Sequence, residues 1–175
     1  EIACPNPIDP YGLAKLGGEY ACKYVMNSYG LDVVITRAFN HFGEKQREEL
    51  LIPSIITKAL RADKIVMGNP SPSRDFIYVG DIIAGYLLAM EKGRKGEIYN
   101  LCSQVERSVK SIVDEILVVG GFIREVEWAE PRIIDVQRQW GNYTKAKKEF
   151  GWKPRISFKE ALKMTVKWYE DSLHK

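Results

Sequence analysis

The sequence is poor in the features that mark disulfide-stabilised, metal-binding, membrane and nucleic-acid-binding proteins. It contains three cysteines, an odd number without C-x-x-C or Cys/His spacing, so we expect neither a disulfide framework nor a metal site. No apolar run approaches the roughly 20 residues of a membrane-spanning helix, and no signal peptide opens the chain, so we expect a cytoplasmic protein without a membrane partner. The formal net charge is only +3, which is too small to indicate a nucleic-acid partner.

A glycine-rich phosphate-binding turn is also missing. Neither G-x-G-x-x-G nor G-x-x-G-x-x-G occurs, so no segment predicts the turn that seats a dinucleotide pyrophosphate on a helix N-terminus. What is present is a chain of 175 residues, 45% of them apolar and 28% charged. This composition is typical of one ordinary globular unit with a core of its own.

Short runs rich in β-branched residues alternate with segments of helical periodicity. Strands are predicted at 31–37, 64–67, 75–79, 97–102 and 124–128. Helices are predicted at 10–29, 51–62, 81–92, 108–119, 144–150 and 157–173, with Asp81 as an N-cap, whereas 40–49 reads as a loop. The nearly continuous apolar character of 31–37 indicates a strand buried on both faces of a parallel sheet. The alternation predicts an α/β fold.

The most informative segment places a phenol and an ammonium four residues apart at the start of the first helix. Asp9 is a good N-cap and Pro10 a good first helical residue, so Tyr11 and Lys15 fall on one face of the first turns. A cation near a phenol stabilises the phenolate and so makes tyrosine a usable acid or base. Taken alone, the same spacing also fits a half-buried aromatic residue beside a solvated lysine.

Two adjacent glycines interrupt the same helix. Gly17 and Gly18 should each cost about 1 kcal/mol relative to alanine. Either another backbone or a ligand approaches closely at this point, or the helix is simply imperfect.

Several segments resemble one known family. Residues 7–15, Pro-Ile-Asp-Pro-Tyr-Gly-Leu-Ala-Lys, closely resemble the Tyr-x-x-x-Lys segment of the extended short-chain dehydrogenase/reductase superfamily. Segments 37–43, 74–81, 97–101 and 150–154 follow in the order and spacing of its nucleotide-sugar epimerase and dehydratase branch, over nearly the whole chain. The triplet 39–41, the pair 68–69 and the segment 141–147 look most like the GDP-mannose 4,6-dehydratase group and its neighbour that reduces GDP-4-keto-6-deoxymannose.

The resemblance implies a fold and a division of the chain. It implies the C-terminal half of a Rossmann-like doubly wound sheet, with its last parallel strands and helices, plus a small α/β substrate-binding subdomain. Residues 1–50 would end the dinucleotide-binding domain, and 51–175 would form mainly the nucleotide-sugar subdomain. The stretch near 74–102 would return in part to the Rossmann sheet. Because the family's glycine-rich turn precedes its tyrosine, we expect this chain to be a fragment that is inactive alone.

The resemblance also assigns roles to individual residues. Tyr11 would be the catalytic acid/base, and Lys15 would favour ionisation of its phenol and hydrogen-bond the nicotinamide ribose. Asn40 would contact cofactor and substrate, with His41 as structural support. Arg74 and Arg132 would bind the substrate diphosphate, for which two guanidinium groups are well suited, and Arg138 is a fallback for Arg132. For each arginine the plain alternative is a surface ion pair.

The function implied for the intact protein is NAD(P)-dependent modification of a nucleotide-diphosphate sugar. GDP-mannose 4,6-dehydration is favoured, with NADP as cofactor in that case, and NAD or NADP otherwise. A GDP-4-keto-6-deoxymannose reductase or an NDP-sugar 4-epimerase is the close alternative. A sugar-nucleotide-binding or scaffold fragment without catalysis is the alternative of another class. A homodimer through the helix at 10–28 is expected.

Overall fold

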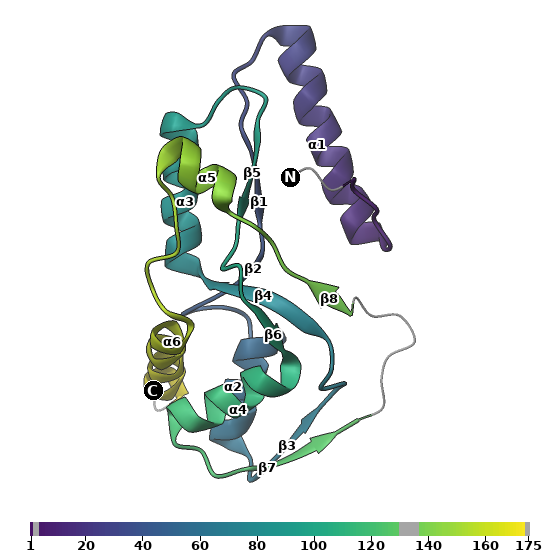
Figure 1. The fold of residues 1–175 in the computed structure, drawn as a ribbon. Coiled ribbons are helices and arrows are strands. Elements are labelled where there is room, and N and C mark those ends of the chain that lie inside the picture. Colours follow the sequence, from purple (N-terminus) through teal and green to yellow (C-terminus); the bar gives the residue numbers. More distant parts are fainter. Residues whose placement is uncertain (2–3, 130–136, 174–175) are drawn as a thin grey trace.

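The structure is a computed structural model that describes residues 1, 4–129 and 137–173. Its elements gather around two hydrophobic cores, one above the other in Figure 1. The strands form two pairs and one set of four, and parallel pairing dominates. The α/β fold predicted from the sequence is therefore confirmed.

The upper core forms where two strands that are distant in sequence meet. β1 (Ile35–Ala38) pairs in parallel with β5 (Ile98–Leu101), from Ile35 opposite Ile98 to Ala38 opposite Leu101. The helices α3 (Val79–Lys92) and α5 (Thr144–Phe150) pack on this pair. Among the described strands β1 pairs only with β5, so its other edge is unpaired.

The lower core lies beneath a second sheet. In that sheet β4 (Ser73–Tyr78) lies between β2 (Asn40–Phe42) and the antiparallel β6 (Glu106–Ser108), and the short β8 (Arg138–Gln139) also pairs with β4. Three helices supply most of the apolar side chains: α2 (Leu51–Arg61), α4 (Val109–Gly120) and α6 (Phe158–Leu173). The parallel pair β3 (Lys64–Met67) and β7 (Glu125–Trp128) completes this part.

The first helix stands apart from both cores. α1 (Pro10–Tyr29) has no buried residue, and Figure 1 shows it beside the β1–β5 pair. Gly30 ends it in the left-handed conformation, and the Lys95 ammonium donates to the Gly30 carbonyl oxygen at 2.8 Å. Apart from its chain neighbours and the nearby backbone of the helix itself, a Cβ atom added at Gly17 or Gly18 would meet no described atom within 4 Å. No helix in the described ranges is long and apolar enough to cross a membrane.

Two sequence-based boundaries are wrong for reasons that are not local. The predicted loop begins with β2, because Asn40, His41 and Phe42 pair with Phe76–Tyr78 of β4. The helix α3 begins at Val79, so Asp81 is not its N-cap. The Asp81 carboxylate instead accepts the backbone N–H groups of residues 155 and 156, each at 3.1 Å, and so fixes the linker between α5 and α6.

Candidate functional site

The N-terminus of α1 holds the predicted tyrosine and lysine together. The Asp9 side chain accepts the Gly12 N–H at 2.6 Å, which satisfies one of the free donors of the first turn. The Lys15 ammonium lies 5.2 Å from the centroid of the Tyr11 ring, within the range of a cation–π contact. Tyr11 is 71% exposed, so it is not the half-buried aromatic residue of the plain alternative, and Lys15 is exposed as both interpretations expect. Both polar groups are accessible to a ligand.

A second group of predicted residues meets along β4. Asn40 lies opposite Phe76, and its amide donates to the Asp75 carbonyl oxygen at 3.4 Å and to Gln139 Oε1 at 3.1 Å. Arg74 lies between Gln139 of β8 and Arg107 of β6, and its Nη1 donates to the Ser73 carbonyl oxygen at 2.9 Å. The structure therefore brings Asn40 and Arg74 onto the adjacent strands β2 and β4, with Gln139 beside both.

The two remaining arginines of the prediction differ. Arg132 lies outside the described residues. Arg138, the fallback, is exposed and donates to both oxygens of Glu106 at 2.7 and 2.6 Å. Hydrogen bonds from Arg138 and from the Ser73 hydroxyl lower the pKa of Glu106 to about 2. Arg138 is thus in the local ion pair of the plain alternative, where it holds β8 against β6.

The sequence did not indicate a role for a buried carboxylate on β4 itself. Asp75 is fully buried, and its two oxygens accept the backbone N–H groups of Ser103 at 2.7 Å, Gln104 at 2.9 Å and Gly141 at 3.3 Å. It therefore ties β4 to the loop after β5 and to the segment after β8. Its position next to Arg74 is the only local signal, because its partners lie 28 to 66 residues away in sequence.

The same carboxylate affects the neighbouring thiol. Burial, and secondarily the charge of Asp75, raise the pKa of Cys102 to about 12. The thiol is therefore protonated at neutral pH and packs as a small apolar group. His41, predicted as support, is exposed, and its Nδ1 lies 3.1 Å from the Phe39 carbonyl oxygen.

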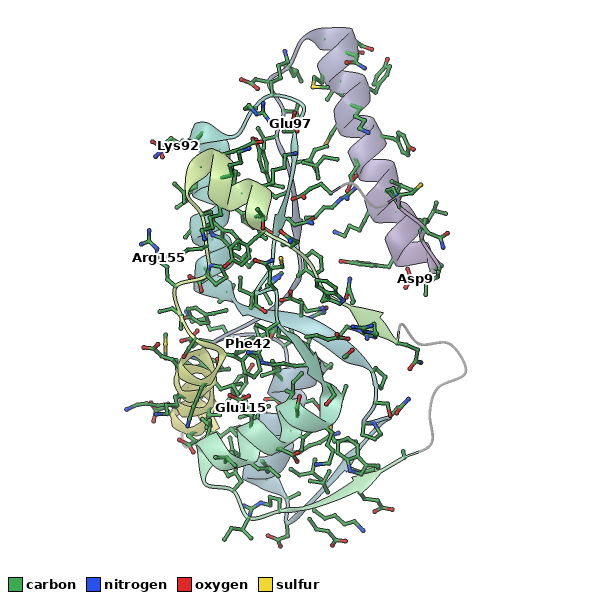
Figure 2. The ribbon with its side chains drawn as sticks, in the orientation of Figure 1. Asp9, Phe42, Lys92, Glu97, Glu115 and Arg155 are labelled. Carbon is green, nitrogen blue, oxygen red and sulfur yellow. The ribbon has the colours of Figure 1, made fainter. Side chains whose placement is uncertain are left out.

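Figure 2 shows how these parts lie in the molecule. Asp9, at the start of α1, lies on one side, and Arg155, on the linker between α5 and α6, lies on the other. Figure 1 shows β8 on the same side as the start of α1. These side chains suit a ligand that carries both a secondary alcohol and phosphate groups. The phenol and ammonium of α1 suit the alcohol, and the amide of β2 and the guanidinium of β4 suit the phosphates.

Comparison with known proteins bears on this arrangement. The family model for GDP-mannose 4,6 dehydratase matches residues 1–165. The chain is similar to RMD from Pseudomonas aeruginosa complexed with NADPH, with 28% identity, a TM-score of 0.93, and coverage of 98% of this chain and 60% of that one. It is similar to UDP-glucose 4-epimerase from Thermotoga maritima with UDP-glucose, with 31% identity, a TM-score of 0.92, and coverage of 96% and 55%.

A third solved structure widens the range of chemistry. It is dTDP-glucose 4,6-dehydratase from Bacillus anthracis str. Ames in complex with NAD, with 30% identity, a TM-score of 0.90, and coverage of 97% of this chain and 54% of that one. The chain spans about half the length of the curated relatives that it matches, 55% of one and 53% of another.

Proposed function

The chain belongs to the GDP-mannose 4,6 dehydratase family, among NAD(P)-dependent nucleotide-sugar dehydratases, epimerases and reductases, and from that premise we propose that the whole protein is a GDP-mannose 4,6-dehydratase. In this reaction the C4 hydroxyl is oxidised to a ketone, water is lost across C5 and C6, and the hydride returns to the sugar. Tyr11 and Lys15 would hold the ribose end of the nicotinamide cofactor, NADP in this proposal, which would supply the hydride-transfer chemistry when bound.

The observation that carries the proposal is the exposed pair at the start of α1. A phenol that removes a proton from a secondary alcohol needs its phenolate stabilised, and the Lys15 ammonium lies 5.2 Å from the Tyr11 ring centroid. We assign Tyr11 as the acid/base at the C4 oxygen. Lys15 supports it and also binds the cofactor ribose.

The strand residues supply substrate contacts in this proposal. Arg74 offers a planar guanidinium to the diphosphate, for which charge-assisted and bidentate hydrogen bonds are suited. Asn40 offers an amide beside it, aligned by its hydrogen bond to Gln139. Arg132 would be the second diphosphate ligand, as the family resemblance implies.

The described residues suit only part of a dinucleotide site. Tyr11 and Lys15 are exposed and fit the ribose end of the cofactor. The sequence contains no glycine-rich turn for the pyrophosphate, so residues outside this chain would have to supply it. We therefore propose that the 175-residue chain alone has no appreciable turnover and binds NAD(P) weakly.

The exposed face of α1 supports a second copy of the protein as partner. No residue of this helix is buried, and large side chains stand exposed along it: Tyr11, Leu13, Tyr20, Tyr24 and Tyr29. Gly17 and Gly18 have open space around them, which would allow a second helix backbone to approach. We propose a homodimer through this helix.

A reductase or a 4-epimerase is the second candidate, because the solved structures that resemble the chain include an epimerase with UDP-glucose and an NADPH complex. The whole protein should be incubated with GDP-mannose and NADP⁺, and separately with UDP-glucose and dTDP-glucose. A dehydratase removes one water, which mass spectrometry detects, and GDP-mannose should be the substrate that loses it. Inversion at C4 without loss of water would establish an epimerase, and conversion of none of the three sugars would contradict the dehydratase proposal.

A further inference from the structure

A pocket opens beside the linker that carries Arg155, across the molecule from Asp9 (Figure 2). It has a volume of about 350 Å³ and lies between β4, the residues around β6 and the linker that joins α5 to α6. Arg107, Arg155, Ser103 and Ser157 contribute its polar lining, and Phe76 and Phe158 are among its apolar residues. Among the described residues that line this pocket, none is acidic. Two cationic residues without an acidic partner in the lining favour an anion.

Arg107 is the central feature of this pocket. It projects from β6, and its guanidinium carbon lies 4.1 Å from the centroid of the Phe158 ring, in a cation–π contact. The side chain is half-buried, and its Nη1 atom is fully buried without a hydrogen-bond partner among the described residues. A buried donor that is left unpaired typically costs about 1–3 kcal/mol, so this N–H group calls for an acceptor.

The nearby carboxylates do not supply that acceptor. Asp75 and Glu115 attract the Arg107 guanidinium through space, but burial dominates and lowers the Arg107 pKa. Both oxygens of Asp75 already accept backbone N–H groups. The guanidinium remains charged at neutral pH, because the pKa of arginine is far above it.

The end of a long helix adds to the positive character of the pocket. Ser157 and Phe158 stand at the N-terminus of α6, a helix of 16 residues, and the Ser157 hydroxyl accepts the Glu160 N–H at 3.2 Å. Helix N-termini carry a partial positive charge that favours anions. Asp81 holds the backbone of the linker, so this wall of the pocket is fixed by a contact to α3.

We propose that this pocket is a second ligand site, which binds the phosphate group of a small phosphate ester on Arg107, with Arg155 at its mouth. A phosphate offers three or more acceptor oxygens, enough for the guanidinium N–H groups of Arg107 and for the hydroxyl of Ser157. The volume exceeds the need of inorganic phosphate alone and leaves room for a short organic part. Figure 2 shows Arg155 across the molecule from Asp9, so the pocket lies away from Tyr11 and Lys15. Arg74 lies opposite Arg107 on the neighbouring strand but does not line the pocket.

The test is a binding titration on the whole protein, in which every residue of the pocket keeps its native surroundings. Inorganic phosphate and glycerol 3-phosphate are titrated separately at constant ionic strength, with NMR of the arginine side-chain N–H groups and of the backbone. We expect saturable shifts at Arg107 and at residues 155–158. The ester should bind at least threefold more tightly than inorganic phosphate, and the reverse order would assign the site to free phosphate.

Variants decide whether Arg107 holds the anion. Arg107→Met keeps an apolar side chain on Phe158 but removes the donors, and should weaken binding at least tenfold. Arg155→Met, at an exposed position, should weaken it about two- to fivefold, as expected for a screened surface charge, and tests the pocket without disturbing buried groups. The matched control is Arg61→Met, which removes an arginine that pairs with Glu48 on the surface and should leave binding within twofold.

Some results would overturn the proposal. Shifts that do not saturate, or that stay the same in Arg107→Met, would mean an adventitious ion only, with water satisfying Nη1. Loss of binding in Arg74→Met but not in Arg107→Met would place the anion at the diphosphate site instead. The experiment measures phosphate binding at Arg107 and not turnover at Tyr11. A negative result would therefore leave the dehydratase proposal intact, and a lack of dehydratase activity would leave this binding proposal intact.

Discussion

Arg37 donates through Nε and Nη2 to the two oxygens of Glu19, both at 2.7 Å, and this pair joins α1 to β1. Both side chains are only partly exposed, at 26% and 16%. The hydrogen bond from Arg37 and its charge lower the pKa of Glu19. Since α1 buries no residue in the described structure, this bidentate contact largely sets where Tyr11 and Lys15 point.

Removal of the pair should release α1 without unfolding the cores. Glu19→Gln should raise hydrogen exchange across residues 10–29 by about fivefold, equivalent to roughly 1 kcal/mol, while β4 and β5 stay protected. Because the pKa of Glu19 is lower in the folded chain, its contribution is present above the ordinary glutamate pKa and is lost as the pH falls through the folded-state value. Wild-type α1 should therefore loosen as the pH falls below the ordinary glutamate pKa, and Glu19→Gln should show no such transition. If the protection of residues 10–29 in the wild type did not change over this pH range, the Glu19–Arg37 pair would not be what holds α1.

The acid/base role of Tyr11 can be tested against a matched position on the same helix. In the whole protein, Tyr11→Phe should lower kcat by about 10²–10⁴ while sugar-nucleotide affinity stays within a few-fold, because the ring remains and only the ionisable oxygen is lost. Tyr20 has a similar lysine neighbour, with the Lys23 ammonium 5.6 Å from its ring centroid. Tyr20→Phe should therefore leave kcat unchanged. Near-wild-type turnover in Tyr11→Phe would make that tyrosine a surface residue without a catalytic role.

Arg74 should determine affinity for the diphosphate. In the whole protein, Arg74→Ala should weaken GDP-mannose binding by about 1.5–3 kcal/mol, the usual scale of a hydrogen bond to a charged group. Arg74→Lys should recover only part of this, because an ammonium lacks the planar fork. Isothermal titration calorimetry of wild type and both variants measures the difference, with Arg61→Ala as the control, since Arg61 pairs with Glu48 on the surface. Equal affinities for all of them would remove Arg74 from the site.

Asp75 should be needed for the order of the loops around β4. Asp75→Asn places an amide N–H₂ group against backbone donors, and should lower the free energy of unfolding by about 1–3 kcal/mol. Denaturant unfolding measures this loss, and hydrogen exchange should rise at Ser103, Gln104 and Gly141. Asp114→Asn, which breaks an exposed pair with Lys110, should change stability by less than about 0.5 kcal/mol. If both variants lowered the free energy of unfolding by a similar amount, the hydrogen bonds to the buried Asp75 carboxylate would contribute no more to stability than an exposed ion pair.

The α/β fold and the position of the helical tyrosine were predictable because both depend on local patterns. The 3.6-residue period, the Asp9 cap and Pro10 act within a few residues of chain, and α1 begins at Pro10 as expected. The family resemblance of residues 74–81 also pointed to β4, although only Arg74 in it was given a role.

The rest depends on contacts between segments that lie far apart in the sequence. The β2 strand forms because β4 offers it backbone partners, and Asp75 is a structural residue because loops 28 and 66 residues away turn their N–H groups toward it. The Arg107 guanidinium likewise lies over the ring of Phe158, which is 51 positions further along the sequence, and its Nη1 atom is left without a hydrogen-bond partner there. No local pattern marks any of these three relationships.

The unpaired edge of β1 has a practical consequence for handling the chain. Strand edges with free N–H and C=O groups act as templates for pairing with other chains, and native proteins usually cover them or place charges on them. Arg37 is the one charge on this short strand, and Glu19 already engages it. The isolated chain should therefore self-associate as its concentration rises, and added salt should do little to prevent it, because hydrogen bonding along the strand drives this association.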